Sequence, residues 1–279
     1  MVALDNAVSV ISRMIPAVLS IVLGAGCSDA NSLQESSITI EQRRAAIKST
    51  MQHLDGGRGR EALAIISSLA KKDPHSPATQ EAYATVLLAH SLQLDRDGEM
   101  DKGITYRRMA LEAYRAACTN STAPGLLQLS TAQLAQMLGE TKVATLYYEK
   151  AHDSNEGDGR AAFFLTQMYL FNKEWQQAKH WINESLLRDP NEPYALLSAA
   201  LVEAELGNFS MAQAYSKRGC EILPDDPNLR CMQARVIRLS GNPTRALELL
   251  SALPEPVRGS ALVNDERALC ILQIEEKTN

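Results

Sequence analysis

The stretch Gly-Asn-Phe-Ser-Met-Ala at residues 207–212 returns 34 residues later as Gly-Asn-Pro-Thr-Arg-Ala at residues 241–246. The proline that follows a helical run also recurs at this interval, at Pro190 and Pro224. The alanine that ends each stretch belongs to a longer series with the same spacing: Ala144, Ala178, Ala212 and Ala246. A fixed period of this length indicates a supersecondary unit that is repeated along the chain and stacks on its neighbours.

One unit, residues 159–192, explains the period physically. Leu165 and Tyr169 are four residues apart and therefore share one face of a first helix. Pro190 ends the second helix, because proline lacks an amide hydrogen and disfavours helix at the residue before it. The second helix has small and apolar residues at helical spacing, at Ala178, Ile182 and Ser185. A residue as small as Ala178 lets the paired helices approach closely, so the unit is predicted to be a helix–turn–helix.

This spacing resembles the tetratricopeptide repeat. Residues 159–192 match four of the eight consensus positions of that family. The other four are substituted, by Ala162, Thr166, Ile182 and Ser185. The resemblance implies an all-α tetratricopeptide-repeat solenoid that coils into a right-handed superhelix and binds other proteins. No alternating strand pattern competes with helix anywhere in the chain.

Further units extend the array in both directions. Units begin near Gly125, Gly159, Pro193 and Pro227, and an earlier one begins near Arg43. An irregular unit starts near Pro77. Its second helix lies further along the chain than the period requires, because Ala62 and Ala110 are 48 residues apart, 14 more than the period. We therefore expect an insertion at residues 95–103.

The last helix is predicted at residues 260–276, where Leu262, Leu269 and Leu272 alternate with charged residues. Such a helix is typical of the cap that shields the open end of a repeat stack. The sequence thus predicts six helix pairs and one C-terminal capping helix. Since no long polar linker interrupts residues 41–279, we expect one continuous array.

Composition narrows the possible functions. The chain is 45% hydrophobic, which is enough for a packed core, and its net charge is only -5. Acidic and basic residues are interspersed, and the clustered basic face of nucleic-acid-binding proteins is missing. We therefore expect no nucleic-acid partner.

The N-terminal sequence predicts where in the cell the protein is located. Residues 14–26 form an apolar run of 13 residues after Arg13, too short to span a bilayer but typical of a signal peptide at residues 1–26. The run ends at Cys27 and resembles a bacterial lipobox, which implies lipidation of Cys27 and a flexible tether at residues 27–40. Gly24 stands where that motif usually has leucine, and the alternative is an ordinary leader with an incidental cysteine. The resemblance implies that Ser28 after the cysteine, where aspartate is absent, directs the protein to the periplasmic face of the outer membrane. The alternative location is the cytoplasm, with Cys27 unmodified.

No catalytic motif is found, and we expect neither an enzyme nor a cofactor. The glycine-rich residues 55–59 lie where a turn between paired helices is expected. Asp95, Asp97 and Asp101 lack the glycine and glutamate of a calcium loop, so we interpret them as a solvated loop. The five histidines are scattered, and we expect no metal site.

Cys220 and Cys231 are close enough in sequence for a disulfide across a turn in an oxidising compartment. The alternative is that both are buried free thiols, which are common in helical arrays.

The resemblance implies that certain first-helix positions line a concave groove. Most of the corresponding side chains are apolar, which suits an amphipathic helix or an apolar peptide. At the end of the array Arg235 and Arg238 are suited to an acidic residue or a terminal carboxylate. The groove positions before them are Leu126, Leu129, Gln133, Met137, Phe163, Gln167, Leu170, Phe171, Tyr194, Leu197 and Leu201.

Leader and repeats together resemble the pilotins of type IV pili and the tetratricopeptide lipoprotein of the tight-adherence (Tad, Flp pilus) machinery. This resemblance implies a lipid-anchored scaffold whose partner is a secretin or another pilus or secretion component. Two alternatives stay open: a soluble cytoplasmic scaffold or secretion chaperone, and an envelope scaffold for polysaccharide export. The sequence leaves the oligomeric state open, because an exposed apolar groove can also self-associate.

Overall fold

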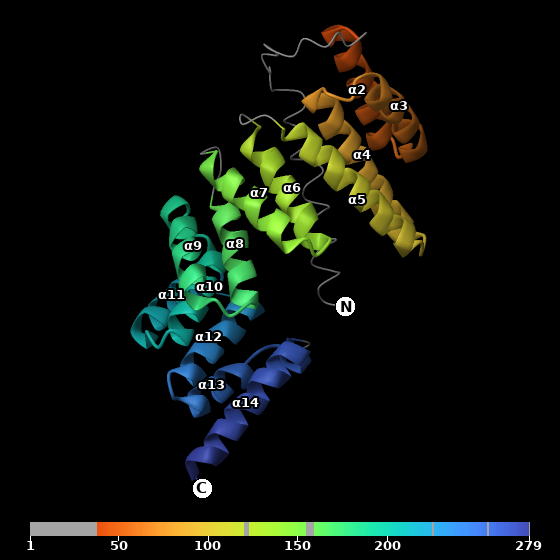
Figure 1. Cartoon of the computed structure of the whole chain (residues 1–279). Helices are drawn as coiled ribbons and strands as arrows, with labels where there is room; N and C mark the ends of the chain where they lie inside the picture. The colour runs from red at the N-terminus through yellow and green to blue at the C-terminus, as the bar shows by residue number, and fades with distance from the viewer. Residues whose placement is uncertain (1–37, 120–122, 155–158, 225, 256, 279) are drawn as a thin grey trace. The chain divides into compact units, whose positions relative to one another are not determined.

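The computed structural model describes residues 38–119, 123–154, 159–224, 226–255 and 257–278. In this part of the chain the regular structure is helical, without a strand (Figure 1). The α-helices are α2 (Ile40–Asp55), α3 (Gly59–Lys72), α4 (Pro77–Arg96), α5 (Met100–Ala117), α6 (Gly125–Met137), α7 (Thr141–Asp153), α8 (Arg160–Phe171), α9 (Trp175–Arg188), α10 (Pro193–Glu205), α11 (Phe209–Ile222), α12 (Pro227–Leu239), α13 (Pro243–Ser251) and α14 (Ala261–Thr278), and a short 3-10 helix spans Val257–Gly259.

Consecutive helices pack as pairs. The six pairs are α2 with α3, α4 with α5, α6 with α7, α8 with α9, α10 with α11, and α12 with α13, and α14 follows them. This confirms the predicted six pairs and C-terminal capping helix in the described residues. The glycine-rich turn is confirmed too, since it lies between α2 and α3.

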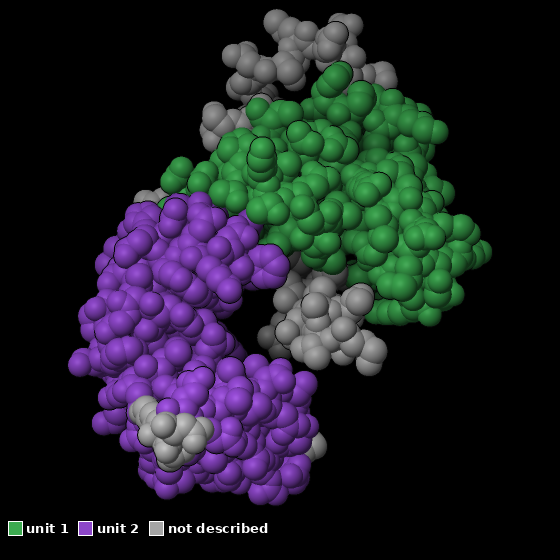
Figure 2. Space-filling model, turned by 60° about the horizontal axis from the view of Figure 1, so that its bottom comes forward, with its two compact units in different colours: residues 1–156 green, residues 157–279 purple. Residues whose placement is uncertain are grey.

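The chain divides into two compact units, residues 1–156 and residues 157–279 (Figure 2). Unit 1 contains α2 to α7 and unit 2 contains α8 to α14. The right-handed superhelix and the single continuous array concern both units together and stay predictions.

The predicted loop insertion at residues 95–103 is wrong. Helices α4 and α5 are 20 and 18 residues long, and the turn between them covers only residues 97–99. The additional residues therefore lengthen both helices of the pair. Asp95 lies within α4 and pairs with Arg107 of α5, whose Nη2 is 3.2 Å from Asp95 Oδ1. Asp101 lies in the first turn of α5. Of the three aspartates only Asp97 lies in the exposed turn, so the solvated-loop interpretation holds for Asp97 and is wrong for Asp95 and Asp101.

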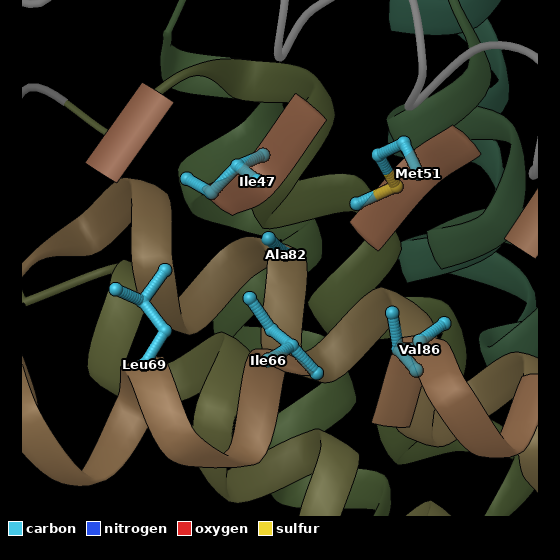
Figure 3. Packing of buried hydrophobic residues seen from close by; sticks show 7 residues of the cluster. Ile47, Met51, Ile66, Leu69, Ala82 and Val86 are labelled. Atoms are coloured by element: carbon cyan, nitrogen blue, oxygen red, sulfur yellow. The ribbon is translucent and has the colours of Figure 1, made fainter. Parts of the chain in front are cut away.

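Small residues sit where the paired helices cross. The four alanines of the 34-residue series, Ala144, Ala178, Ala212 and Ala246, are all completely buried. Larger side chains fill the space around such contacts, as in the unit 1 cluster where Ile47 and Met51 of α2, Ile66 of α3 and Val86 of α4 meet (Figure 3). The close approach that the period predicts is thus present in the structure.

The turn inside each repeat needs a left-handed residue. Gly139, Gly207 and Gly241 occupy it with φ of 75°, 81° and 91°. Lys173 stands in the same slot of the repeat and has φ of 58°, the one positive value at a non-glycine position in the described residues. A side chain in this region costs about 1 kcal/mol, so the α8–α9 turn is strained.

Candidate partner-binding site

Unit 2 brings together most of the predicted groove residues. Phe163, Gln167, Leu170 and Phe171 lie on α8, and Tyr194, Leu197 and Leu201 lie on α10. We call these seven residues the unit 2 face. Two aromatic side chains of this face are exposed, Phe171 by 89% and Tyr194 by 39%, and the other five are half-buried. In the space-filling view the surface of unit 2 is hollowed on one side (Figure 2).

Phe163 is partly a core residue. It packs against a buried cluster of Ile182, Ala195 and Ala199, which come from α9 and α10. Its ring also meets Phe164 edge-on, with centroids 5.7 Å apart. Phe163 therefore helps to hold α8, α9 and α10 together and presents only part of its ring to a partner.

Hydrogen bonds fix the polar members of the face. Gln167 Nε2 donates to Ser198 Oγ at 2.8 Å, which joins α8 to α10. The Tyr194 hydroxyl donates to Asp226 Oδ2 at 2.8 Å, and Asp226 also accepts from the amides of Asn228 and Leu229 at the start of α12. The side chains of Gln167 and Tyr194 are thus oriented before any partner arrives, which lowers the entropy cost of binding.

The predicted carboxylate-binding arginines have internal partners. The Arg238 guanidinium forms an ion pair with Glu266 of α14, and both side chains are largely buried. Arg235 Nη2 lies 3.4 Å from Glu205 Oε1. Assigning Arg238 to an open groove was wrong, because the cap supplied a carboxylate whose position the repeat spacing alone does not reveal.

Unit 1 holds the other four predicted groove residues, all on α6. Met137 is 37% exposed, Leu126 and Gln133 are half-buried, and Leu129 is buried with 6% exposure. Leu129 is therefore a core residue, which corrects its assignment to the groove. Whether these residues continue the unit 2 face into one strip stays a prediction.

Glu81 on α4 is a residue that the sequence reasoning missed. It stands four residues after Pro77, as Leu197 of the unit 2 face stands four residues after Pro193. Burial raises the pKa of its carboxyl group to about 7. Nearby, Thr85 Oγ1 and the Tyr114 hydroxyl are 3.3 Å apart. The feature of the sequence that could have identified Glu81 was a charged residue at a first-helix position that recurs in the other repeats.

The four cysteines of the described residues, Cys118, Cys220, Cys231 and Cys270, are buried free thiols. Cys231 shares a buried cluster with Cys270 of α14, and that cluster does not include Cys220. Burial, aided by the nearby Glu266 carboxylate, raises the pKa of the Cys231 thiol to about 11. The structure therefore has the free-thiol alternative and not the disulfide that the sequence left possible between Cys220 and Cys231.

Three further points concern the N-terminal segment, metal binding and membrane-spanning helices. The signal peptide and Cys27 lie outside the described residues. Within the described residues, no group of three or more histidine, cysteine or acidic side chains is placed to hold a metal ion. None of the helices described here combines the length and apolar character needed to cross a membrane.

Comparison with known proteins identifies the class of fold. The chain is an all-α tetratricopeptide-repeat solenoid, and no protein-family model matches it. It is similar to the structure of PilF from Pseudomonas aeruginosa, with 18% identity, a TM-score of 0.58, and coverage of 82% of this chain and 97% of that one. It is also similar to a tetratricopeptide repeat protein from Parabacteroides merdae ATCC 43184, with 20% identity, a TM-score of 0.58, and coverage of 84% and 91%.

A third structure, of the type IV pilus biogenesis factor PilW, gives 17% identity, a TM-score of 0.58, and coverage of 81% of this chain and 99% of that one. Among curated proteins, the cellulose synthase operon protein C of Pseudomonas fluorescens (strain SBW25) is 25% identical over an alignment of 174 residues, which covers 58% of this chain. The match spans only 14% of that relative's length. These similarities define the fold, and they do not identify the binding partner.

Proposed function

We propose that this chain is a non-enzymatic scaffold, anchored to the periplasmic face of the outer membrane through a lipidated Cys27. It holds an amphipathic or apolar segment of another protein on its first helices. The observation that carries the binding proposal is the unit 2 face, where Phe171 is 89% exposed and Leu170, Leu197 and Leu201 are half-buried. Exposed apolar side chains of this kind mark interaction sites, and aromatic residues supply much of their binding energy.

Binding in this proposal is a packing event. An amphipathic helix lays its apolar side along α8 and α10, and Phe171 loses its contact with water. The side chains of Gln167 and Tyr194 are already fixed by Ser198 and Asp226, so they lose little freedom when the segment docks. Covering an apolar segment also keeps it from aggregating before it reaches its own assembly.

The partner we propose is a secretin or another component of a pilus machine, of the Tad or type IV kind. Support comes from two structural neighbours, PilF and the type IV pilus biogenesis factor PilW. Acylation of Cys27 would confine the scaffold to the membrane where such a ring assembles, and two or more acyl chains give stable anchoring.

A second candidate is a scaffold for export of an envelope polysaccharide. The resemblance to a protein named for the cellulose synthase operon favours it. This candidate keeps the same anchor and the same binding face and differs only in the partner.

The test starts from the full chain expressed in a Gram-negative host, with a Cys27→Ser variant as the control. Membrane fractionation and the mass of the N-terminal peptide report the anchor. Acylated Cys27 in the outer-membrane fraction supports the proposal. An intact Met1 in the soluble fraction contradicts the anchor and favours a cytoplasmic scaffold or secretion chaperone.

The partner is then identified by affinity capture on wild type and on Phe171→Glu in parallel. A secretin captured only by wild type supports a role in pilus assembly. A polysaccharide synthase or export component captured only by wild type supports the second candidate function. Equal capture by both proteins would show that the unit 2 face is not the binding surface.

A further inference from the structure

The turn between α8 and α9 differs from the turns inside the other five helix pairs. Lys173 occupies its left-handed position, with φ of 58°. Glycine adopts this conformation without steric cost, whereas a side chain there costs about 1 kcal/mol. The turns of the other five pairs each have a glycine with positive φ, at Gly57, Gly98, Gly139, Gly207 and Gly241.

No contact within the described residues offsets the strain at Lys173. A Cβ atom added at the equivalent Gly207 or Gly241 would have no atom within 4 Å, so this position of the repeat faces open space. Lys173 is likewise exposed. Its ammonium group has neither an ion-pair partner nor a hydrogen-bond acceptor in the part of the chain that the structure describes. Strain that the chain itself does not offset is typical of positions that serve a function.

Lys173 follows the most exposed aromatic residue of the unit 2 face. Phe171 precedes it by two residues and is 89% exposed. Asn172 between them is exposed as well. An accessible ring and a cation without an internal partner therefore belong to the same short turn.

Other cations of unit 2 are engaged within the chain. Lys179 of α9 pairs with Glu203 of α10, with 2.9 Å between Nζ and Oε1. Arg235 and Arg238 of α12 have the carboxylates of Glu205 and Glu266. Lys173 differs from these residues because its charge stays available to a group outside the chain.

We propose that Lys173 binds a carboxylate of the protein segment that docks on the unit 2 face, next to the apolar residue that packs on Phe171. This inference rests on the binding role proposed above and specifies the partner as an amphipathic segment with an acidic residue at the edge of its apolar side. The ammonium group has three donors on a flexible stem, which suits a carboxylate at such an edge. The carboxylate recognition that the sequence assigned to Arg235 and Arg238 thus falls to Lys173.

The probes are fluorescein-labelled amphipathic peptides made of leucine, alanine and glutamine. The parent peptide contains no glutamate. Each other peptide has one glutamate, at one of about seven successive positions, so that two helical turns sample every side of the helix. Fluorescence anisotropy with the full-length protein should show at least one glutamate peptide that binds about threefold more tightly than the parent, as an exposed ion pair allows. High salt should reduce this gain.

Variants at Lys173 test whether its charge is the cause. Lys173→Gln should abolish the gain, and Lys173→Arg should keep it. Lys173→Gly should also abolish it, although glycine relieves the strain of the turn, so that weaker binding does not come from lost stability. The matched control is Lys217→Gln, at a lysine of α11 whose side chain is 76% exposed, and it should bind all the peptides as wild type does.

Two results would overturn this inference and leave the unit 2 face standing as a binding surface. They are the absence of a gain at every glutamate position, and a gain that persists in Lys173→Gln. If the parent peptide and all the glutamate peptides fail to bind wild type saturably, the proposed binding face is contradicted, and this inference with it.

Discussion

The guanidinium of Arg238 on α12 is paired with the carboxylate of Glu266 on α14, across the seam between the last repeat and its cap. Both side chains are largely buried, with 13% and 7% exposure. A buried pair of this kind contributes little compared with apolar packing, but losing one partner leaves an uncompensated charge in a poorly solvating place. The packing of α14 against α12 should therefore tolerate the loss of both charged residues better than the loss of one.

Replacing Arg238 by methionine should destabilise the protein by about 3 kcal/mol, because Glu266 then stays buried without its cation. Replacing Glu266 by leucine in the same chain removes the charge and should restore most of the loss. Urea unfolding monitored by circular dichroism measures both effects. If the double variant is as unstable as Arg238→Met, the pair contributes through its shape and not through its charge.

Replacing Lys173 by glycine should stabilise the protein by about 1 kcal/mol, since glycine adopts the positive φ of that turn without steric cost. The matched control is Lys142→Gly, at an exposed lysine near the start of α7, where glycine should destabilise the helix by about 1 kcal/mol. The shift of the urea midpoint shows whether each variant is more or less stable than wild type. A loss of stability in Lys173→Gly would mean that the lysine side chain makes up for its strained backbone.

Glu81 should make stability depend on pH between its ordinary pKa of 4.5 and its native pKa of about 7. Within this window the native protein binds more protons than the unfolded chain, so the free energy of unfolding falls as pH rises and levels off above pH about 7. A shift of this size corresponds to at most about 3 kcal/mol.

The measurement is a comparison of wild type with Glu81→Gln, whose neutral amide stays uncharged at all these values. The free energy of unfolding of wild type relative to this variant should fall from pH 5 to pH 8 because only wild type must ionise a buried carboxyl group. Parallel stability curves for the two proteins would contradict a raised pKa at Glu81.

Replacing Phe171 by glutamate should weaken partner binding at least tenfold, a loss of about 1.4 kcal/mol or more, because the most exposed aromatic residue of the unit 2 face becomes charged. Helical content should not change, since the side chain is 89% exposed. Phe163 is a poorer choice for this test because its ring also packs against Ile182. Co-precipitation with a co-expressed secretin measures the effect, and Leu187→Glu, changed at an exposed residue of α9, is the control that should keep binding.

The period of 34 residues was sufficient to predict the class of fold, the six pairs and the starts of the regular repeats. It works because each pair buries a small residue such as Ala178 at the same point of its crossing, so spacing along the chain reports spacing in the stack. Where the period breaks, between Ala62 and Ala110, the sequence predicted a loop and the structure has longer helices. Periodicity alone cannot tell an inserted loop from extra helical turns, because both add residues between the same two landmarks.

The binding positions were predicted less completely than the fold. Phe171 and Tyr194 are exposed as a binding face requires, but Leu129 is buried and Arg238 is bound to Glu266. The repeat register fixes which side of a first helix a residue lies on. It does not fix what the neighbouring elements bring to that side, such as the cap's carboxylate.

The sequence by itself determined the repeat, its helices and the small residues at each crossing, because these depend on spacing within one unit. Only the tertiary structure decided which apolar residues are covered. Ala234 and Ala268 are alike in sequence, yet one is core and the other is surface. The reason is that burial depends on whether a second helix packs on that side, and this is a property of the assembled stack and not of the unit.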